Sequence, residues 1–454
     1  GVISETLVQG IEREMAFWNQ FTLLAAVLAT CTQDASGFMT LPSLGLRSSI
    51  SFASSLPFQA RRGGSYAGGK QGVVMAGEMK GPGLVLGPRD KSEGEFFDSK
   101  SFARPVVKRY RTVEGDENWR MWYSGRDTDF DAEAIGISTG RTGLCESTDG
   151  IEWKRVEGDE ALGSVLDFNE EEWWGYDTVH TMAGDVQIIA TDKVRGSSAV
   201  SDAGYGVNFM FVSGGDAEEV DMSGVAFGGK TLPDETLIKG LRMRIGLALS
   251  YDGVHWTRME GDHHSGAVFD VGEDGEFDSL MCGWPQVVQH MPGDLRMYYT
   301  TYDRDSEKWC VGLARSDDGF KWQKKGMVLS GGAEGAFDER GISRTWTVMN
   351  PTTRNYTMFC EGHGPQGHSI GTYTSLDGIT FEPTNGGEPI LVPSKEEGAW
   401  DAEHVAFPCV MPMDDGSCRL YYSCSPKEGG SGIGMAVSDG LDWSKFERYT
   451  ADGI

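Results

Sequence analysis

The segment Ser147-Thr148-Asp149-Gly150-Ile151-Glu152-Trp153 decides the fold, because close copies of it recur along the 454-residue chain. Asp-Gly between strand-like runs is typical of a hairpin turn, since glycine tolerates the positive φ that such a turn needs. The Ser and Asp side chains can accept hydrogen bonds from backbone amides of the turn, and the aromatic residue then begins the next strand. The further copies begin at Ser250, Ser316, Ser375 and, one residue shorter, Ser438.

Three more motifs recur in phase with these turns. An aromatic-rich strand precedes each turn, as in 120–125, and a short apolar strand follows it, as in 165–166. Each unit then begins again with an aromatic residue followed by Asp and an apolar strand. The aromatic-Asp pairs are Phe97-Asp98, Tyr176-Asp177, Phe277-Asp278, Phe337-Asp338 and Trp400-Asp401. Four strands per unit, repeated five times, predict a radial all-β architecture.

We therefore predict an all-β fold, a five-bladed β-propeller of four-stranded antiparallel blades. The apolar run Leu84-Val85-Leu86 is the unmatched copy of the fourth strand and precedes the first blade. It is expected to complete the last blade and so close the ring. A β-sandwich is the alternative, but it would not explain five copies in phase. The predicted propeller covers 77–454, with blades at about 98–170, 177–270 (carrying an insertion at 185–240), 278–330, 338–393, and 401–454 plus strand 83–87.

Residues 1–76 have the character of a targeting leader. The apolar run 21–31 has the length of a signal-peptide core, and 35–76 contains no Asp or Glu but several Ser and Arg residues. A signal peptide followed by an acid-poor, Ser/Arg-rich segment resembles the bipartite plastid-targeting leaders of algae with secondary plastids. The resemblance implies a plastid protein, in the stroma. The alternative is a disordered tail on a secreted protein.

Composition narrows the function further. Acidic residues exceed basic ones by 28, which disfavours binding to phosphate backbones and so excludes nucleic acid as a partner. None of the eight cysteines forms a CxxC pair, and no Cys/His cluster has zinc-finger spacing. No phosphate-binding loop or dinucleotide motif is placed on suitable elements. We expect no cofactor, with a structural cation on the propeller axis as the one exception considered, and no membrane span in the mature chain.

A five-bladed propeller with these Tyr-rich strands and Ser-x-Asp-Gly-x-x-Trp hairpins resembles the clan of glycoside hydrolase families 43, 32, 62, 68 and 130, over roughly residues 80–454. The resemblance implies an active site at the end of the central funnel where the innermost strands begin. Members carry catalytic carboxyl groups there, one of which stays protonated to release the sugar oxygen. In this chain Arg104-Pro105 stands where the clan often has Asp-Pro, and 281–285 offers no Glu where the clan acid is expected.

The candidate site residues follow from this mixture of repeated and unrepeated positions. Asp177, Asp278 and Glu403 are the candidate catalytic carboxylates. The aromatic-Asp residues recur in every blade, however, which favours a structural role for Asp177 and Asp278. Residues that interrupt the repeat are the better candidates for binding a ligand. These candidates are Arg104, His180, Trp284, Arg344, Trp346 and His404.

Two functions remain open from the sequence. The chain is either a glycoside hydrolase-like enzyme acting on a carbohydrate in the plastid, or a catalytically inactive propeller that binds a glycan or serves as a scaffold for a protein partner. The incomplete carboxylate set favours the second, and the clan resemblance favours the first. His363 and His368 flank a Gly-rich loop, but the sequence shows no further ligands that would complete a metal site with them.

Overall fold

The computed structural model of the chain describes residues 81–111, 115–130, 138–189, 206–227, 230–350, 353–424 and 431–451. The predicted leader therefore lies outside the described residues. The described ranges consist of β-strands, connecting loops and three short 3-10 helices, η2 (Lys91–Glu93), η3 (Ala161–Gly163) and η4 (Asn385–Gly387). Within the same ranges, no helix has the length and apolar character that a bilayer crossing requires.

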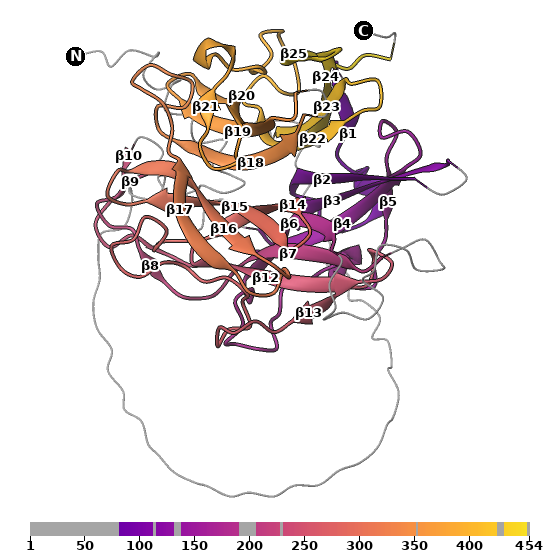
Figure 1. Ribbon diagram of the computed structural model, residues 1–454. Helices are drawn as coiled ribbons and strands as arrows, with labels where there is room; N and C mark the ends of the chain where they lie inside the picture. Colours follow the sequence, from indigo (N-terminus) through magenta and orange to yellow (C-terminus); the bar gives the residue numbers. More distant parts are fainter. Residues whose placement is uncertain are drawn as a thin grey trace, which may run out of the picture. The chain divides into compact units, whose positions relative to one another are not determined.

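Five antiparallel sheets follow one another along the chain as the blades of a propeller (Figure 1). Blade 1 contains β2 (Ser101–Arg111), β3 (Glu117–Arg126), β4 (Gly140–Ser147) and β5 (Lys154–Val156); blade 2 contains β6 (His180–Ile188), β7 (Asn208–Gly215), β12 (Met243–Ser250) and β13 (Thr257–Met259); blade 3 contains β14 (Gly283–Met291), β15 (Asp294–Asp303), β16 (Lys308–Ser316) and β17 (Gln323–Leu329); blade 4 contains β18 (Ile342–Met349), β19 (Tyr356–Gly364), β20 (Gly367–Ser375) and β21 (Glu382–Pro383); blade 5 contains β22 (Ala406–Pro412), β23 (Cys418–Cys424), β24 (Gly432–Asp439) and β25 (Asp442–Arg448). The first strand of each blade contacts the first strands of its neighbours: β2 contacts β6 and β22, β14 contacts β6 and β18, and β18 contacts β22. The first strands therefore surround the axis, as predicted.

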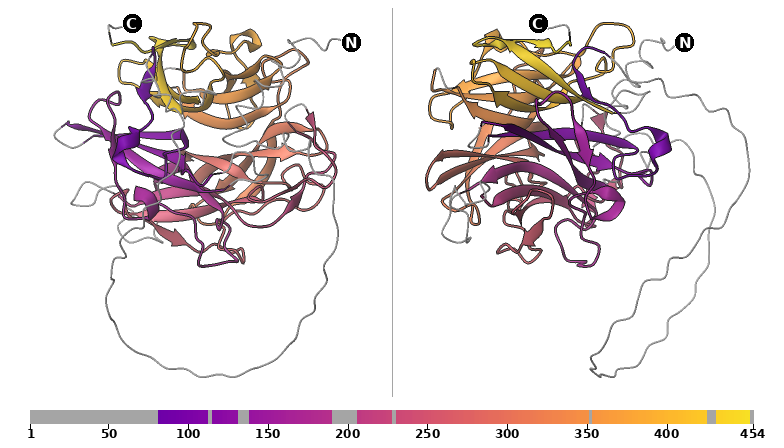
Figure 2. Two further views of the ribbon diagram at one scale, coloured as in Figure 1. Left: turned by 180° about the vertical axis from the view of Figure 1, so that it is seen from behind. Right: turned by 90° about the vertical axis from the view of Figure 1, so that its right-hand side faces the viewer.

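The N-terminal strand closes the ring, which confirms the prediction. β1 (Leu84–Leu86) pairs antiparallel with β24, with Leu84 opposite Gly434, while β25 pairs with the other half of the same edge. Figure 2 shows β1, in indigo, beside the yellow strands of blade 5. In other blades an apolar residue just before the next aromatic-Asp pair holds this position, as Leu166 does opposite Thr142. Leu84 therefore occupies the equivalent outer position in blade 5, beside a strand that lies more than 300 residues away in sequence.

The Asp-Gly turns form as the sequence predicts. In the first turn Ser147 Oγ accepts from Gly150 N at 2.9 Å, and Asp149 Oδ1 accepts from Ile151 N at 2.8 Å. Gly150 has a φ of 72°, a value that side-chain-bearing residues rarely adopt. The turns at Ser250, Ser316 and Ser375 repeat the serine hydrogen bond to the glycine amide.

The aromatic residue after each turn packs against the neighbouring blade. Its ring meets an aromatic ring from the second strand of the preceding blade, mostly edge to face, which suits the ring quadrupoles. The five pairs are Trp153–Tyr421, Trp256–Trp122, Trp322–Phe211, Phe381–Tyr298 and Trp443–Phe359. Because the blades are joined in the same way all round, the repeated motif accounts for the packing between sheets.

The aromatic-Asp residues brace the inside of each blade. Asp98 Oδ2 accepts from the Tyr123 hydroxyl at 2.8 Å and from Arg155 Nε at 2.9 Å, which links the loop before β2 to β3 and β5. The equivalent pairings are Asp177 with Arg258, Asp278 with Tyr299 and Lys324, Asp338 with Tyr373, and Asp401 with Tyr422 and Arg448. These contacts support the structural interpretation of the repeated aspartates.

Blade 2 carries extra chain between its second and third strands. Two short strand pairs form there, β8 (Val220–Asp221) with β11 (Leu237–Ile238) and β9 (Ala226–Phe227) with β10 (Lys230–Thr231). Buried residues of this segment, including Met222 and Ile238, pack in one cluster with Trp284 and Trp309. The extra chain therefore covers part of the propeller end where the first strands begin, which we call the mouth.

Candidate functional site

A β-bulge interrupts the first strand of every blade, close to the axis. Pairing breaks after Ala103, Ala183, Gly283, Ser343 and Ala406. In four blades the bulge residue has a positive φ: 64° at Arg104, 48° at Trp284, 47° at Arg344 and 54° at Phe407. Such values are unusual for residues with side chains, and they often mark functional positions. In blade 2 the position is taken by Ala183, which has no positive φ.

The neighbouring blade holds each bulge amide. Arg104 N donates to Ser423 Oγ at 3.0 Å, and Trp284 N donates to Ser213 Oγ at 2.7 Å. Arg344 N donates to Thr300 Oγ1 at 2.8 Å in the same way. The acceptors occupy equivalent positions near the ends of the second strands, so one hydrogen bond is repeated from blade to blade.

Blade 4 departs from this pattern because a carboxylate replaces the hydroxyl. Glu361 Oε2 accepts from Phe407 N at 3.2 Å, while Oε1 binds Arg344 Nη1 at 2.5 Å and His368 Nδ1 at 2.7 Å. Burial opposes ionisation of Glu361, but the charges of Arg344 and His368 and the hydrogen bonds outweigh it and lower the pKa to about 2. At neutral pH Glu361 is therefore ionised, and both of its carboxylate oxygens accept hydrogen bonds.

Aromatic rings and guanidinium groups lie close to the propeller axis. The Arg344 guanidinium carbon lies 4.4 Å from the Phe407 ring centroid and 4.6 Å from that of Trp284. The Arg104 guanidinium carbon lies 4.9 Å from the same Phe407 ring and 5.7 Å from Trp284. All four side chains are buried. The geometry suits cation–π attraction, and it brings together the sequence candidates Arg104, Trp284 and Arg344.

Three histidines adjoin Glu361, but they are poorly suited to hold a cation. Nδ1 or Nε2 atoms of His363 and His368 lie within 4.8 Å of each other and of a Glu361 oxygen, so the cluster has metal-ligand residue types. Arg344 already neutralises that carboxylate, and its positive charge would repel a metal ion. Burial, then the positive charge of His368, holds the pKa of His363 well below its usual range, and the same two causes lower the pKa of His404. The arrangement therefore favours neutral His363 and His404 side chains as hydrogen-bonding and stacking groups.

His180, another sequence candidate, is also at the mouth. Its Nε2 atom lies 2.8 Å from the Gly240 carbonyl, and its ring lies beside Gly140. Burial, then the charges of Arg126 and Arg104, lowers the pKa of His180 to about 3. A neutral imidazole therefore forms part of the wall next to these two arginines.

The candidate carboxylates do not join this cluster. Asp177 and Asp278 are bound within their own blades by Arg258 and Lys324, each at 2.7–2.8 Å. Burial raises the pKa of Asp177 in spite of the Arg258 charge, as a general acid would need, but its partner lies on an outer strand. Glu403 is half-buried in the loop before β22.

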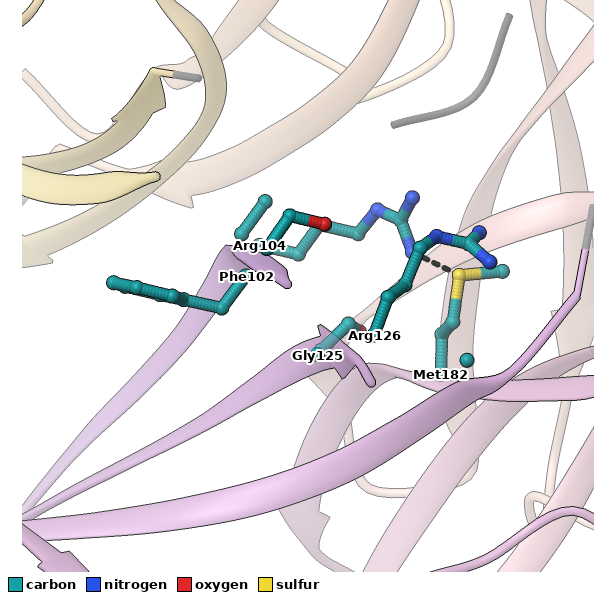
Figure 3. Close-up of a pocket in the computed structure, with 9 residues that line it drawn as sticks. Phe102, Arg104, Gly125, Arg126 and Met182 are labelled. Atoms are coloured by element: carbon teal, nitrogen blue, oxygen red, sulfur yellow. Dashed lines mark hydrogen bonds between the residues drawn. The ribbon is translucent and has the colours of Figure 1, made fainter. Parts of the chain in front are cut away.

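Two cavities adjoin the axial residues. The axial cavity, with about 350 Å³ of empty space including open solvent, is lined by residues of the first strand of every blade, among them Trp346, whose ring centroid lies 4.9 Å from Lys108 Nζ. The mouth cavity (Figure 3) encloses about 240 Å³ on the same basis, and Arg104, Ser124, Arg126 and Met182 line it. The two cavities share Arg104.

Glu361, Arg126, Ser124 and Trp309 were not among the candidate site residues from the sequence, and His363 was named there only for the Gly-rich loop that it flanks. Trp309 stacks on His363 with centroids 5.5 Å apart. Glu361 had a usable signal, because the equivalent positions before Gly125 and Gly214 are serines.

No family model and no curated protein matches the chain. Several solved structures match it in fold. The protein of a BT0996 RGII complex aligns with a TM-score of 0.52 and 17% identity, over 81% of this chain and 94% of that one. A glycosyl hydrolase from Bacteroides ovatus aligns with a TM-score of 0.51 and 17% identity, over 82% and 97%. The GH32 beta-fructofuranosidase of Bombyx mori aligns with a TM-score of 0.52 and 11% identity, over 82% and 65%. Identities this low show the fold alone, which is the five-bladed propeller of glycoside hydrolases.

Proposed function

We propose that this chain is a carbohydrate-binding propeller in which the two-carboxylate chemistry of a glycosidase is not assembled. The observation that carries the proposal is the state of Glu361, the carboxylate in contact with the axial residues Arg344 and Phe407. A glycosidase needs one carboxyl group that stays protonated to donate to the leaving oxygen. Glu361 has a pKa of about 2 and accepts from three groups, so it supplies no proton near neutral pH.

An exposed aromatic pair supports a sugar as the ligand. Trp173 and Trp174 are 83% and 47% exposed, and their rings meet edge to face at 6.1 Å. They lie in the connection that enters β6, which places them at the mouth end of blade 2. Indole faces stack on the apolar C–H faces of sugar rings, and adjoining exposed apolar side chains often mark a binding surface. The structural neighbours named as glycoside hydrolases further support a carbohydrate.

The binding test compares two residues of equal exposure. Leu376, also 83% exposed, follows the third strand of blade 4 and therefore lies at the opposite end of the propeller. The full chain is screened against a glycan array, and intrinsic fluorescence then measures affinity for each hit. We expect Trp173→Ala to weaken binding by about tenfold or more and Leu376→Ala to leave it unchanged. Equal effects of both variants would remove the aromatic platform from the proposal, and an absence of any glycan ligand would favour the scaffold alternative.

The hydrolytic alternative depends on Asp177. Aryl-glycosides, sucrose and arabinan are incubated with the full chain, and released reducing sugar is measured. We expect no turnover. Turnover that Asp177→Asn abolishes in a variant that stays folded at the assay temperature, as its circular dichroism spectrum shows, would overturn the proposal and identify Asp177 as a catalytic acid.

We also propose, from the leader sequence, that the protein acts in the plastid. Residues 1–76 fused to a fluorescent protein should deliver it to the plastid stroma of an alga with secondary plastids. A matched fusion lacking 15–31 should stay in the cytosol, because the signal-peptide core is missing. Secretion of the first fusion into the medium would support the alternative location.

A further inference from the structure

Positive charge outweighs negative charge around the mouth cavity. Arg104 and Arg126 line it and are buried, while Arg344, with Glu361 as its negative partner, lines the adjoining axial cavity. Asp127, the neighbour of Arg126, is itself paired with Arg141. This local excess stands out in a chain whose acidic residues exceed its basic ones by 28.

Two of these guanidinium groups are oriented into the cavity by uncharged acceptors. Arg104 Nη1 donates to Met182 Sδ, and Arg126 Nη1 donates to the Ser138 carbonyl. The Arg126 guanidinium carbon also lies 4.5 Å from the Phe130 ring centroid. Figure 3 shows the Arg104 and Arg126 side chains extending in the same direction, with their guanidinium groups close together near Met182.

Ser124 offers a hydroxyl group in the same cavity. It occupies the position at which Ser213, Thr300 and Ser423 hold the bulge amide of the next blade. In blade 1 a different residue holds the bulge amide of blade 2: Thr142 Oγ1 accepts from Ala183 N at 3.0 Å. Ser124 Oγ is therefore buried with no hydrogen-bond partner among the described residues, although buried hydroxyl groups normally have one.

We propose that the mouth cavity binds the anionic group of a sugar, a carboxylate or a phosphate ester, through Arg104, Arg126 and Ser124. The inference rests on the proposed carbohydrate-binding function and specifies its ligand class. Guanidinium groups match carboxylate and phosphate oxygens in a planar, two-pronged geometry, and a hydroxyl group donates a further hydrogen bond. An anion between the arginines would also offset their mutual repulsion.

The electrostatics agree with this assignment. Burial, then the charges of Arg126 and Arg344, holds the pKa of Arg104 well below its usual range. Burial also lowers the pKa of Arg126 to about 9. A bound anion would stabilise both charged forms.

The ligand test uses pairs of probes that differ mainly in charge. Isothermal titration compares trigalacturonate with its methyl ester, and glucose 6-phosphate with glucose. We expect at least one acidic probe to bind about tenfold or more tightly than its neutral partner, since charge-assisted hydrogen bonds are the strong ones. The two pairs distinguish a carboxylate from a phosphate ester. Equal affinity within both pairs would overturn the anionic ligand while leaving carbohydrate binding intact, whereas no binding of any array glycan or probe would remove both.

Variants locate the anion. Arg126→Gln should reduce affinity for the acidic probe by about tenfold and leave that for the neutral probe unchanged. Arg111→Gln, at the far end of β2, removes the same charge outside the cavity and should change neither. Ser124→Ala provides an independent test if Arg126→Gln fails to fold, because the Ser124 side chain makes no hydrogen bond to the described structure. Unchanged preference for the acidic probe in folded Arg126→Gln and Ser124→Ala would place the anion elsewhere and overturn the assignment.

Discussion

The hydrogen bonds that hold the bulge amides should contribute measurably to the closure of the propeller. Ser213 is fully buried, and its Oγ accepts from Trp284 N at 2.7 Å. Ser213→Ala removes the acceptor and leaves that N–H buried, which costs about 1–3 kcal/mol. Ser124 occupies the equivalent position in blade 1, but its Oγ has no partner among the described residues. Replacing its hydroxyl group with a methyl-sized side chain should therefore cost about 0 kcal/mol.

Urea unfolding monitored by tryptophan fluorescence separates the two serines. With an m-value of roughly 4 kcal/mol/M for a chain of this size, a loss of about 2 kcal/mol lowers the midpoint by about 0.5 M. We expect that shift for Ser213→Ala and an unchanged midpoint for Ser124→Ala. Thr300→Val keeps the side-chain shape but removes the acceptor for Arg344 N, so it should behave like Ser213→Ala. Equal midpoints for the two serine variants would refute the claim that the hydroxyl groups hold the bulges.

Three further predictions follow from the ion pairs and the ring closure. The pKa of Glu361 is lowered from 4.5 to about 2, so its stabilising effect is complete above pH 4.5 and is lost as the pH falls toward 2. The wild type should therefore be more stable than Glu361→Gln by about 3 kcal/mol above pH 4.5, and this difference should shrink as the pH falls toward 2. Urea unfolding at stepped pH measures the difference. Asp177→Asn leaves the charge of Arg258 unpaired, and because Arg258 is partly exposed we expect a loss of about 2 kcal/mol, whereas unchanged stability would contradict a bracing role. Removal of residues 1–88 deletes β1 and should lower the melting temperature, while removal of 1–80 should not, and equal melting temperatures would show that β1 does not fasten the ring.

The sequence was sufficient to predict the architecture because the residues that define it repeat. The Asp-Gly turn and the aromatic residue after it act within one hairpin and against one neighbour, so each copy reports the same local structure. The role of Leu84 was predictable for the same reason, since it was the one apolar segment without a complete unit around it. The pairing of Asp98 with Tyr123 and Arg155 was not predicted, although a structural role for the repeated aspartate was.

The arrangement at the axis could not be predicted in the same way, because it depends on contacts between residues far apart in sequence. The bulge amide of Arg104 is held by Ser423, and the hydroxyl of Ser124 lacks a partner among the described residues only because Thr142 holds Ala183. No local pattern contains this information. The dipeptides Arg104-Pro105 and Trp284-Pro285 do mark the bulges, since proline lacks the amide hydrogen that strand pairing needs.

The residues that break the repeat also show that the fold does not require the charges at its centre. Ala183 fills the bulge position of blade 2, and Gly215 stands where blade 1 has Arg126, so a small side chain is sufficient for these positions. Burying a guanidinium group costs several kcal/mol unless a partner compensates for it. A sugar has no fivefold symmetry, and a site for it in a fivefold ring must arise from positions at which the blades differ. Arg104 and Arg126 are such positions, and the Ser124 hydroxyl differs from its counterparts in holding no bulge amide; all three residues line one cavity, which is why a ligand explains them better than packing does.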